Sequence, residues 1–336
     1  MTEPEPLVAA RDLGIHFRLS RKTVLKAVDG VSLEVWPGET FGIIGESGSG
    51  KTTLGRSLVC LETPSAGQVL HRGLDPQTLS SRQLRRHRRD YQVVFQDPNA
   101  ALDPRMTILR SIREPLDVAG TLPRAERERI ALQAMERVGL GGEFAARYPH
   151  ELSGGQKQRV CIARVLTLRP AVIVCDEAVA ALDVSIQADI LNLLADLQRE
   201  FGLTYIFITH NLGVVGHISD RVAVMYLGRL VEMGETEAVL GKPLHPYTEA
   251  LLSAEPVALP SHMRTERRVV LTGELPSPIS PPSGCRFRTR CRFAQERCAE
   301  EEPDWQEVRP GQWAACHFAG TLPAAPVKHR MAEALS

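Results

Sequence analysis

Short apolar segments, rich in β-branched residues or alternating with polar positions, recur along the chain and predict β-strands. They cover residues 8–17, 28–36, 40–44, 171–177 and 204–210. A further pair of apolar runs at 221–234 predicts a β-hairpin that turns at Leu227-Gly228. The strands therefore fall into one group near the N-terminus and a second group beyond the middle of the chain.

Between these groups, apolar residues recur at three- and four-residue spacing, which is the pattern of amphipathic helices. The spacing predicts helix over most of 98–168 and again at 188–202, and a shorter helix at 52–60 follows a glycine-rich loop. Strands that alternate with helices indicate an α/β fold with a largely parallel core sheet.

Composition and charge narrow the class of protein. The 336 residues correspond to about two domains. Lys plus Arg and Asp plus Glu each total 40, and a basic run at 82–89 lacks interleaved aromatic residues, so we expect no nucleic-acid partner. No apolar run approaches the roughly 18 residues of a membrane-spanning helix, and the N-terminus has no apolar signal segment. We therefore expect a soluble intracellular protein.

Residues 45–52, here called the phosphate loop, match the pattern G-x-x-x-x-G-K-[ST] directly after a predicted strand and before a predicted helix. Glycines let backbone N–H groups turn toward phosphate oxygens at the positive end of the helix. Lys51 should reach the β- and γ-phosphates of a nucleotide, and the Thr52 hydroxyl should bind Mg²⁺. The nucleotide-binding residues expected here are Gly45, Glu46, Ser47, Gly48, Ser49, Gly50, Lys51, Thr52 and Thr53.

Two further segments carry residues suited to phosphate chemistry. Asp176 and Glu177 follow a predicted buried strand, where an Asp can hold Mg²⁺ and the Glu can act as general base on an attacking water. The sequence LSGGQ at 152–156, here called the signature loop, precedes an amphipathic helix. Ser153 can cap that helix, and Gly154 and Gly155 expose backbone N–H groups at its positive end, which makes a second anion site.

In their order, these motifs resemble the ATP-binding cassette (ABC) ATPases that drive membrane transporters. The loop at 152–156 resembles the family's signature motif, and Gln96 in VVFQDP resembles its Q-loop glutamine. Asp183 in Ala-Leu-Asp is similar to the D-loop aspartate, and His210 is similar to the switch histidine. Phe17 stands where the family places an aromatic residue that stacks on adenine. The resemblance covers residues 7–235.

The resemblance implies the fold and the roles of the site residues. We expect a P-loop NTPase of the ABC type, with a RecA-like core, an N-terminal antiparallel β-subdomain, a helical signature subdomain at about 98–168 and a small cysteine-rich C-terminal extension. The nucleotide-binding domain would cover 1–240 and the extension 241–336. The implied catalytic residues are Glu177, His210 and Gln96, the Mg²⁺ ligands Thr52, Gln96 and Asp176, and the further nucleotide contacts Phe17, Ser153, Gly154, Gly155, Gln156 and Asp183.

Several segments are similar to one branch of the family, the oligopeptide and dipeptide importer ATPases. They are QDPNAALDPRM, EAVAALDVSIQ and HPYTEALLSAEP, the last beginning at the tripeptide 245–247 that marks the branch's C-terminal extension. Ala178 and Ala180 stand where the branch usually has Pro and Ser, and Ala101 stands where it has Ser. None of the three is a predicted ligand.

The branch implies an ATP-hydrolysing subunit of a bacterial importer at the cytoplasmic face of the inner membrane. The signature loop of one subunit would cover the ATP of another in a head-to-tail dimer, usually a heterodimer with a second ATPase. Two permease subunits and an extracytoplasmic substrate-binding protein would complete the transporter, with dipeptides or oligopeptides as substrate. Import of nickel or metallophore complexes, a non-transport ATPase acting on nucleic acid or ribosomes, and a regulatory iron–sulfur protein with a degenerate ATPase fold are the alternatives.

Four cysteines are crowded into the stretch after residue 284. Their spacings are too long for the C-x-x-C knuckles of structural zinc, whereas a 4Fe–4S cluster needs four thiolates and tolerates varied loops. We expect a 4Fe–4S cluster, which the resemblance also favours, with zinc or unligated or disulfide-bonded thiols as alternatives. Four arginines between 286 and 292 would offset the negative charge of the ligated thiolates. The expected ligands are Cys285, Cys291, Cys298 and Cys316.

Overall fold

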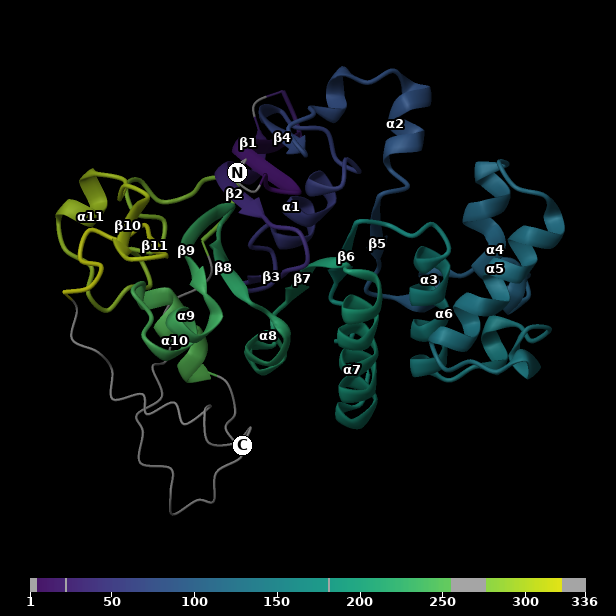
Figure 1. Ribbon diagram of the computed structural model, residues 1–336. Coiled ribbons are helices and arrows are strands. Elements are labelled where there is room, and N and C mark those ends of the chain that lie inside the picture. Colours follow the sequence, from purple (N-terminus) through teal and green to yellow (C-terminus); the bar gives the residue numbers. More distant parts are fainter. Residues whose placement is uncertain (1–4, 22, 181, 255–275, 322–336) are drawn as a thin grey trace, which may run out of the picture.

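A computed structural model describes residues 5–21, 23–180, 182–254 and 276–321, which form two β-sheets and the helices that cover them (Figure 1). The smaller sheet is antiparallel, with the strand order β2 (Val24–Val35), β1 (Val8–Arg18), β4 (Ala66–His71). The larger sheet has the order β10 (Gln306–Arg309), β11 (Gln312–Ala314), β9 (Arg229–Glu235), β8 (Arg221–Tyr226), β3 (Thr40–Ile44), β7 (Thr204–Thr209), β6 (Val172–Asp176), β5 (Tyr91–Val94). Neighbouring strands from β8 to β5 are parallel, and the remaining pairs are antiparallel.

The parallel strands are apolar on both faces because helices cover both. Helix α1 (Lys51–Leu58) packs between the two sheets, where Leu54 and Leu58 share one core with Val174 of β6. The alternate residue Cys175 faces a second core together with α6 (Gly154–Leu166) and α7 (Val184–Phe201). Helix α8 (Leu212–Ile218) follows β7. The expected α/β fold with a largely parallel core sheet is confirmed.

Most of the segment predicted to be helical at 98–168 folds into helices that gather at one side of the molecule, away from the smaller sheet (Figure 1). They are α3 (Pro98–Ala101), α4 (Ile108–Ala119), α5 (Arg124–Arg137) and α6. Their apolar faces pack on one another and, through α6, on α7 and β6. This group carries the signature loop at the start of α6, beside Ile186 of α7.

The described C-terminal residues, which belong to the predicted extension, are joined to the larger sheet. Helices α9 (Thr236–Gly241), α10 (Pro246–Ala254) and α11 (Arg297–Glu300) precede the short hairpin β10–β11, and β11 pairs with β9 opposite Met233 and Glu232. The hairpin therefore continues the main sheet. Its strands have four and three residues, too few for an alternating pattern to be recognised in the sequence. Residues 255–275 and 322–336 of the predicted extension lie outside the described residues.

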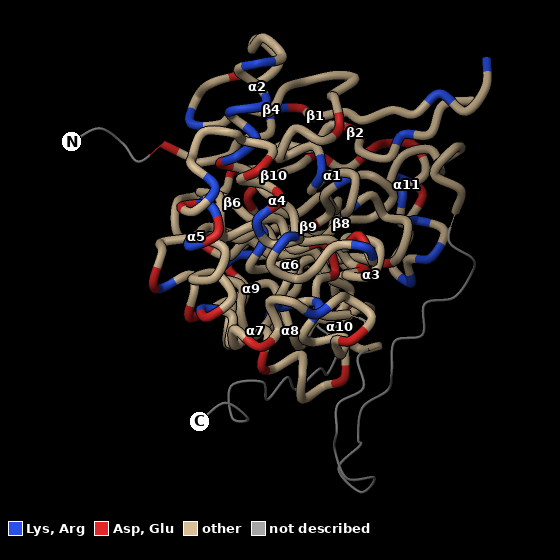
Figure 2. The backbone as a smooth tube through the Cα atoms, turned by 90° about the vertical axis from the view of Figure 1, so that its right-hand side faces the viewer, with Lys and Arg blue, Asp and Glu red and all other residues tan. Residues whose placement is uncertain are grey.

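Helix α2 (Ser81–His87) contains most of the basic run and buries none of its residues, as expected for a solvated helix. Figure 2 shows Lys and Arg interspersed with Asp and Glu over the rest of the surface in view. Among the described residues, none of the helices combines the length and the apolar composition needed to cross a membrane.

Candidate nucleotide site

The phosphate loop joins the end of β3 to the start of α1, as the sequence predicted, and its glycines are required by close backbone contacts. A Cβ atom at Gly45 would lie 2.2 Å from the Met225 carbonyl oxygen, and one at Gly50 would lie 2.1 Å from the Ala27 carbonyl oxygen. Gly50 also has a φ of 105°, which side chains other than glycine rarely adopt. The loop can therefore turn tightly over the first turn of α1.

Lys51 lies beneath this loop and is 5% exposed. Its Nζ donates hydrogen bonds to the carbonyl oxygens of Gly45 (2.8 Å) and Glu46 (2.9 Å). Burial lowers the pKa of Lys51, and the nearby carboxylates of Glu177 and Asp176 oppose that shift. The ammonium group is thus held at the centre of the loop and is the group best placed to meet phosphate oxygens.

Thr52 and Asp176 come together at the end of β6. The Thr52 hydroxyl donates to the Asp176 carboxylate over 2.8 Å, and Asp176 is 3% exposed. Burial raises the pKa of Asp176, while the Thr52 hydrogen bond and the Arg56 charge act in the opposite direction. A hydroxyl and a carboxylate side by side are hard oxygen ligands, so this pair fits a Mg²⁺ ion.

Glu177 is held by two residues that are distant in the sequence. Gln96 Nε2 donates to one carboxylate oxygen over 2.6 Å, and His210 Nδ1 lies 3.3 Å from the other. The backbone at Glu177 has a φ of 48°, and its N–H donates to the Ile208 carbonyl of β7 (2.9 Å). A strained backbone fixed in this way aims the carboxylate toward the edge of the sheet where the phosphate loop lies. The three predicted catalytic residues therefore share one place in the fold.

The signature loop forms the predicted helix cap but lies apart from the phosphate loop of its own chain. The Ser153 side chain accepts from the Gln156 N–H and Gln156 bonds back to the Ser153 N–H, so α6 begins with a capping box. Gly154 is exposed, and a Cβ at Gly155 would lie 2.6 Å from the Ile186 side chain of α7. Figure 1 shows α6 and α1 on opposite sides of β6.

Two other predicted nucleotide contacts are also on the surface. Phe17 is 36% exposed on β1, opposite Leu25 of β2. Asp183 is exposed and precedes α7 without a side-chain hydrogen bond to the helix. The structure does not join either residue to the group around Lys51, so their roles remain predictions.

Two residues outside the predicted site hold the phosphate loop at Glu46. Tyr247 Oη accepts a hydrogen bond from the Glu46 N–H over 2.8 Å. The guanidinium of Arg290 donates two hydrogen bonds to the Glu46 carboxylate, over 2.7 and 2.9 Å. Tyr247 belongs to the tripeptide 245–247, which marked a family branch without a physical role. Arg290 was predicted to offset thiolate charge, and its pairing with Glu46 could not be predicted because it joins positions 244 residues apart.

The four cysteines of the C-terminal segment line one small cavity of about 20 Å³, together with His245 and Phe287. Burial chiefly raises the pKa of the Cys285 thiol to about 12 and of the Cys316 thiol to about 11. Within the described ranges, no set of three or more His, Cys, Asp or Glu side chains is arranged to hold a metal ion.

The role predicted for the neighbouring arginines, to offset the charge of ligated thiolates, stays a prediction. Burial raises the pKa of the Cys291 thiol, and the Arg292 charge opposes that shift. Three of the four are paired with carboxylates outside the thiol cavity, because those acidic groups lie within reach of the same turn: Arg286 with Asp29, Arg290 with Glu46 and Arg292 with Glu249.

Two known sequence families match this chain. Residues 28–180 match the ABC transporter family, and residues 231–298 match the oligopeptide/dipeptide transporter C-terminal region. The chain is 49% identical to a putative oligopeptide transport ATP-binding protein, YkfD, of Bacillus subtilis, over 93% of this chain and 95% of that protein. It is 52% identical to a putative peptide import ATP-binding protein of Brucella ovis, over 94% of this chain and 98% of that protein.

Solved structures of ABC proteins resemble about two thirds or more of this chain. The ATP-binding cassette MJ0796, in a dimeric post-hydrolysis state bound to ADP and Pi, is 31% identical with a TM-score of 0.62, over 68% of this chain and 98% of that chain. The protein cbiO1 from Clostridium perfringens, part of an ABC transporter complex, is 29% identical with a TM-score of 0.63, over 71% of this chain and 92% of that chain. The chain therefore belongs to the ABC transporter ATPases, in the group that carries the oligopeptide/dipeptide transporter C-terminal region.

Proposed function

We propose that this chain is the ATP-hydrolysing subunit of a bacterial peptide importer and that it works at the cytoplasmic face of the inner membrane. The single observation that carries the ATPase assignment is Glu177, held between Gln96 and His210 beside the phosphate loop. The printed names of the relatives support peptide transport as the process it drives.

Each side chain of the nucleotide site has its own role in ATP hydrolysis. Lys51 offers its ammonium to the β- and γ-phosphates, and Thr52 and Asp176 hold Mg²⁺, which neutralises phosphate charge when it is bound. Glu177 takes the proton of the attacking water, and Gln96 and His210 keep its carboxylate aimed at that water. Because Gln96 begins the connection to the helical group α3–α6, loss of the γ-phosphate would be transmitted to those helices.

The exposed signature loop supports a head-to-tail dimer. A helix N-terminus with exposed glycines binds phosphate well, yet here it lies away from its own phosphate loop. A second ATPase chain, expected to be different in sequence, would supply the ATP that this loop covers. The proposal that the two chains differ is based on the resemblance to the oligopeptide and dipeptide importer ATPases, which usually form heterodimers.

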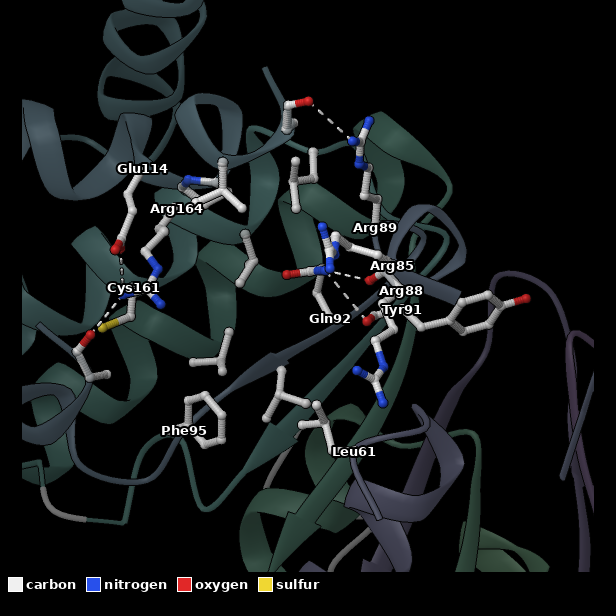
Figure 3. A pocket seen from close by; sticks show the side chains of 18 residues that line it. Leu61, Arg85, Arg88, Arg89, Tyr91, Gln92, Phe95, Glu114, Cys161 and Arg164 are labelled. Atoms are coloured by element: carbon white, nitrogen blue, oxygen red, sulfur yellow. Dashed lines mark hydrogen bonds and ion pairs between the residues drawn. The ribbon is translucent and has the colours of Figure 1, made fainter. Parts of the chain in front are cut away.

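A cavity beside Gln96 supports contact with the permease subunits. It has a volume of about 400 Å³ and lies between β5, α2, α4 and α6 (Figure 3). Phe95 and Leu61 give it an exposed apolar wall, and Arg85, Arg88 and Arg89 gather at one end. These features suit a permease helix with apolar side chains and an acidic residue.

Co-purification and transport assays test the proposed function. The tagged chain should purify from membranes with two multi-spanning subunits, and a peptide-loaded binding protein should stimulate its ATPase in proteoliposomes. Val118→Asp, at a residue 75% exposed in the cavity, should abolish that stimulation, whereas Leu19→Asp, at a residue 57% exposed just after β1, should not. Stimulation by a nickel complex instead of peptide, or association with ribosomes, would overturn the assignment.

We also propose the four-thiol cavity as the site of a 4Fe–4S cluster, with zinc as the alternative. Four thiols that line one cavity are the donor set that such a cluster needs, and the thiols must lose their protons and draw closer to bind it. Protein purified without oxygen should be brown, contain about four iron atoms per chain and lose its colour on Cys291→Ser. Colourless protein with one zinc ion per chain would exclude the cluster.

A further inference from the structure

Glu46, at the start of the phosphate loop, is held by the C-terminal part of the chain from two directions. Its backbone N–H donates to Tyr247 Oη, and its carboxylate receives both donors of the Arg290 fork. Its carbonyl oxygen meanwhile accepts from Lys51 Nζ. The Ser49 N–H also donates to this carbonyl oxygen, over 3.2 Å. Every polar group of Glu46 thus has a partner, and two of the four partner residues lie outside the phosphate loop and its helix.

The two C-terminal partners are themselves rigidly placed. The Arg290 side chain is only 8% exposed, and Tyr247 is fully buried. Phe287, at the other end of the Arg290 turn, packs on the Tyr247 ring at 5.4 Å between centroids, and the Arg290 N–H donates to its carbonyl oxygen. A buried, two-bonded guanidinium on a packed turn fixes its partner far better than an exposed ion pair does.

The same C-terminal turn is anchored a second time near the loop. Arg286 forms an ion pair with Asp29 of β2 and donates to the Leu227 carbonyl oxygen over 2.5 Å. The next residue, Gly228, donates its N–H to the Ser49 carbonyl oxygen of the phosphate loop over 2.8 Å. The turn therefore reaches the phosphate loop at Glu46 directly and at Ser49 through the β8–β9 turn.

These contacts bear on nucleotide affinity because a phosphate loop binds with its backbone. Ser47 and Gly48, which follow Glu46, are exposed, so without a brace this part of the loop would have to be ordered when ATP binds. An interaction that orders a loop beforehand lowers the free-energy cost of binding. We infer that Arg290 and Tyr247 are positioning residues for the nucleotide, and that they set the ATP affinity of this chain by holding Glu46.

The inference rests on ATP binding by the family and is independent of the transported compound. Arg290→Met should raise the Kd for a fluorescent ATP analogue by about 10-fold, which is the loss of about 1.4 kcal/mol of binding free energy. The kcat at saturating ATP should stay near that of the wild type, and Arg290→Lys should restore part of the affinity. Tyr247→Phe, which keeps the ring but removes the acceptor, should raise the Kd less.

Arg297→Met is the matched control, because Arg297 lies in the same region and bonds a carboxylate, that of Glu301 over 2.8 Å, on the surface. Adding Glu46→Gln to Arg290→Met should raise the Kd little further, because both changes break the same pair. Equal effects of Arg290→Met and Arg297→Met, or a fall in kcat with unchanged Kd, would overturn the inference. If Arg290→Met fails to fold, Glu46→Gln alone gives the same test, because an unchanged Kd for the ATP analogue in that variant would also overturn the inference.

Discussion

The phosphate loop and the signature loop are built alike but are supported differently. Each is rich in glycine and precedes a helix whose first N–H groups can bind an anion. The phosphate loop covers the buried Lys51 and is bonded to the β8–β9 turn and to two residues of the C-terminal region. The signature loop is capped by its own Ser153 and Gln156 and leaves Gly154 at the surface.

The difference separates a site that one chain completes from a site that needs a second molecule. Around Lys51, groups from β3, β6 and β7 meet because parallel strands end at the same edge of the sheet. The signature loop, at the start of α6, offers the N–H groups of its exposed residues outward. Breaking the first loop should therefore stop ATP binding, whereas breaking the second should stop only the steps that need the dimer.

The largest effect is expected from Lys51→Ala. Loss of the buried ammonium removes the main charge that phosphate oxygens meet, so both ATP affinity and turnover should fall, with kcat at least ~10²-fold lower. Steady-state phosphate release together with ATP titration checks both. Because a loss of ~10²-fold is expected, a Lys51→Ala variant that keeps more than about a tenth of wild-type turnover would contradict the role of Lys51.

Glu177→Gln should affect turnover alone. The amide keeps the size and the Gln96 and His210 neighbours but cannot accept a proton, so kcat should fall by about 10²-fold or more. ATP binding should persist, and the ATP-bound dimer should accumulate in size-exclusion chromatography. A variant that neither binds ATP nor dimerises would show that Glu177 is structural.

Gly154→Asp tests the signature loop with little risk to the fold. A Cβ at Gly154 would meet only the Leu182 side chain, at 3.4 Å, and an acidic residue in the first helical turn is favourable for the helix itself. The added charge should repel the γ-phosphate of the opposing ATP. We expect unchanged ATP binding by the isolated chain and about 10-fold lower turnover in the assembled transporter.

A combination of variants in the two ATPase chains tests the head-to-tail interpretation. Lys51→Ala in this chain and a signature-loop substitution in the partner should disable one shared site and leave the other active. If both sites lose activity in that combination, the head-to-tail arrangement or the independence of the two sites is wrong.

The smallest effect is expected from Glu232, through the pH dependence of folding stability. Buried Glu232 accepts from the N–H groups of Leu244 and His245, just before Tyr247, and burial raises its pKa to about 7. The unfolded chain ionises this group near 4.3, so between these values the folded chain binds more protons and its stability falls as pH rises, by at most about 1.4 kcal/mol per pH unit. Urea unfolding at pH 5, 6 and 7 should show a flatter dependence in Glu232→Gln. The same pH dependence of unfolding free energy in the wild type and in Glu232→Gln would contradict this role of Glu232.

The sequence by itself determined the alternation of strands and helices, the phosphate loop and the signature cap. These features depend on local rules: apolar spacing, glycine where backbones approach, and a serine that caps a helix. The short strands β4, β5, β10 and β11 were missed, because three to six residues at or next to a sheet edge carry little pattern and depend on their neighbours for pairing.

Only the tertiary structure decided which distant side chains meet. It brought Gln96 and His210 to Glu177, left Phe17 and Asp183 at the surface, and turned three arginines of the cysteine segment toward carboxylates elsewhere. It also joined Arg290 to Glu46 across 244 positions. A contact of that kind leaves no periodicity or spacing in one sequence, because an ion pair depends on the path of the whole chain between its two charges.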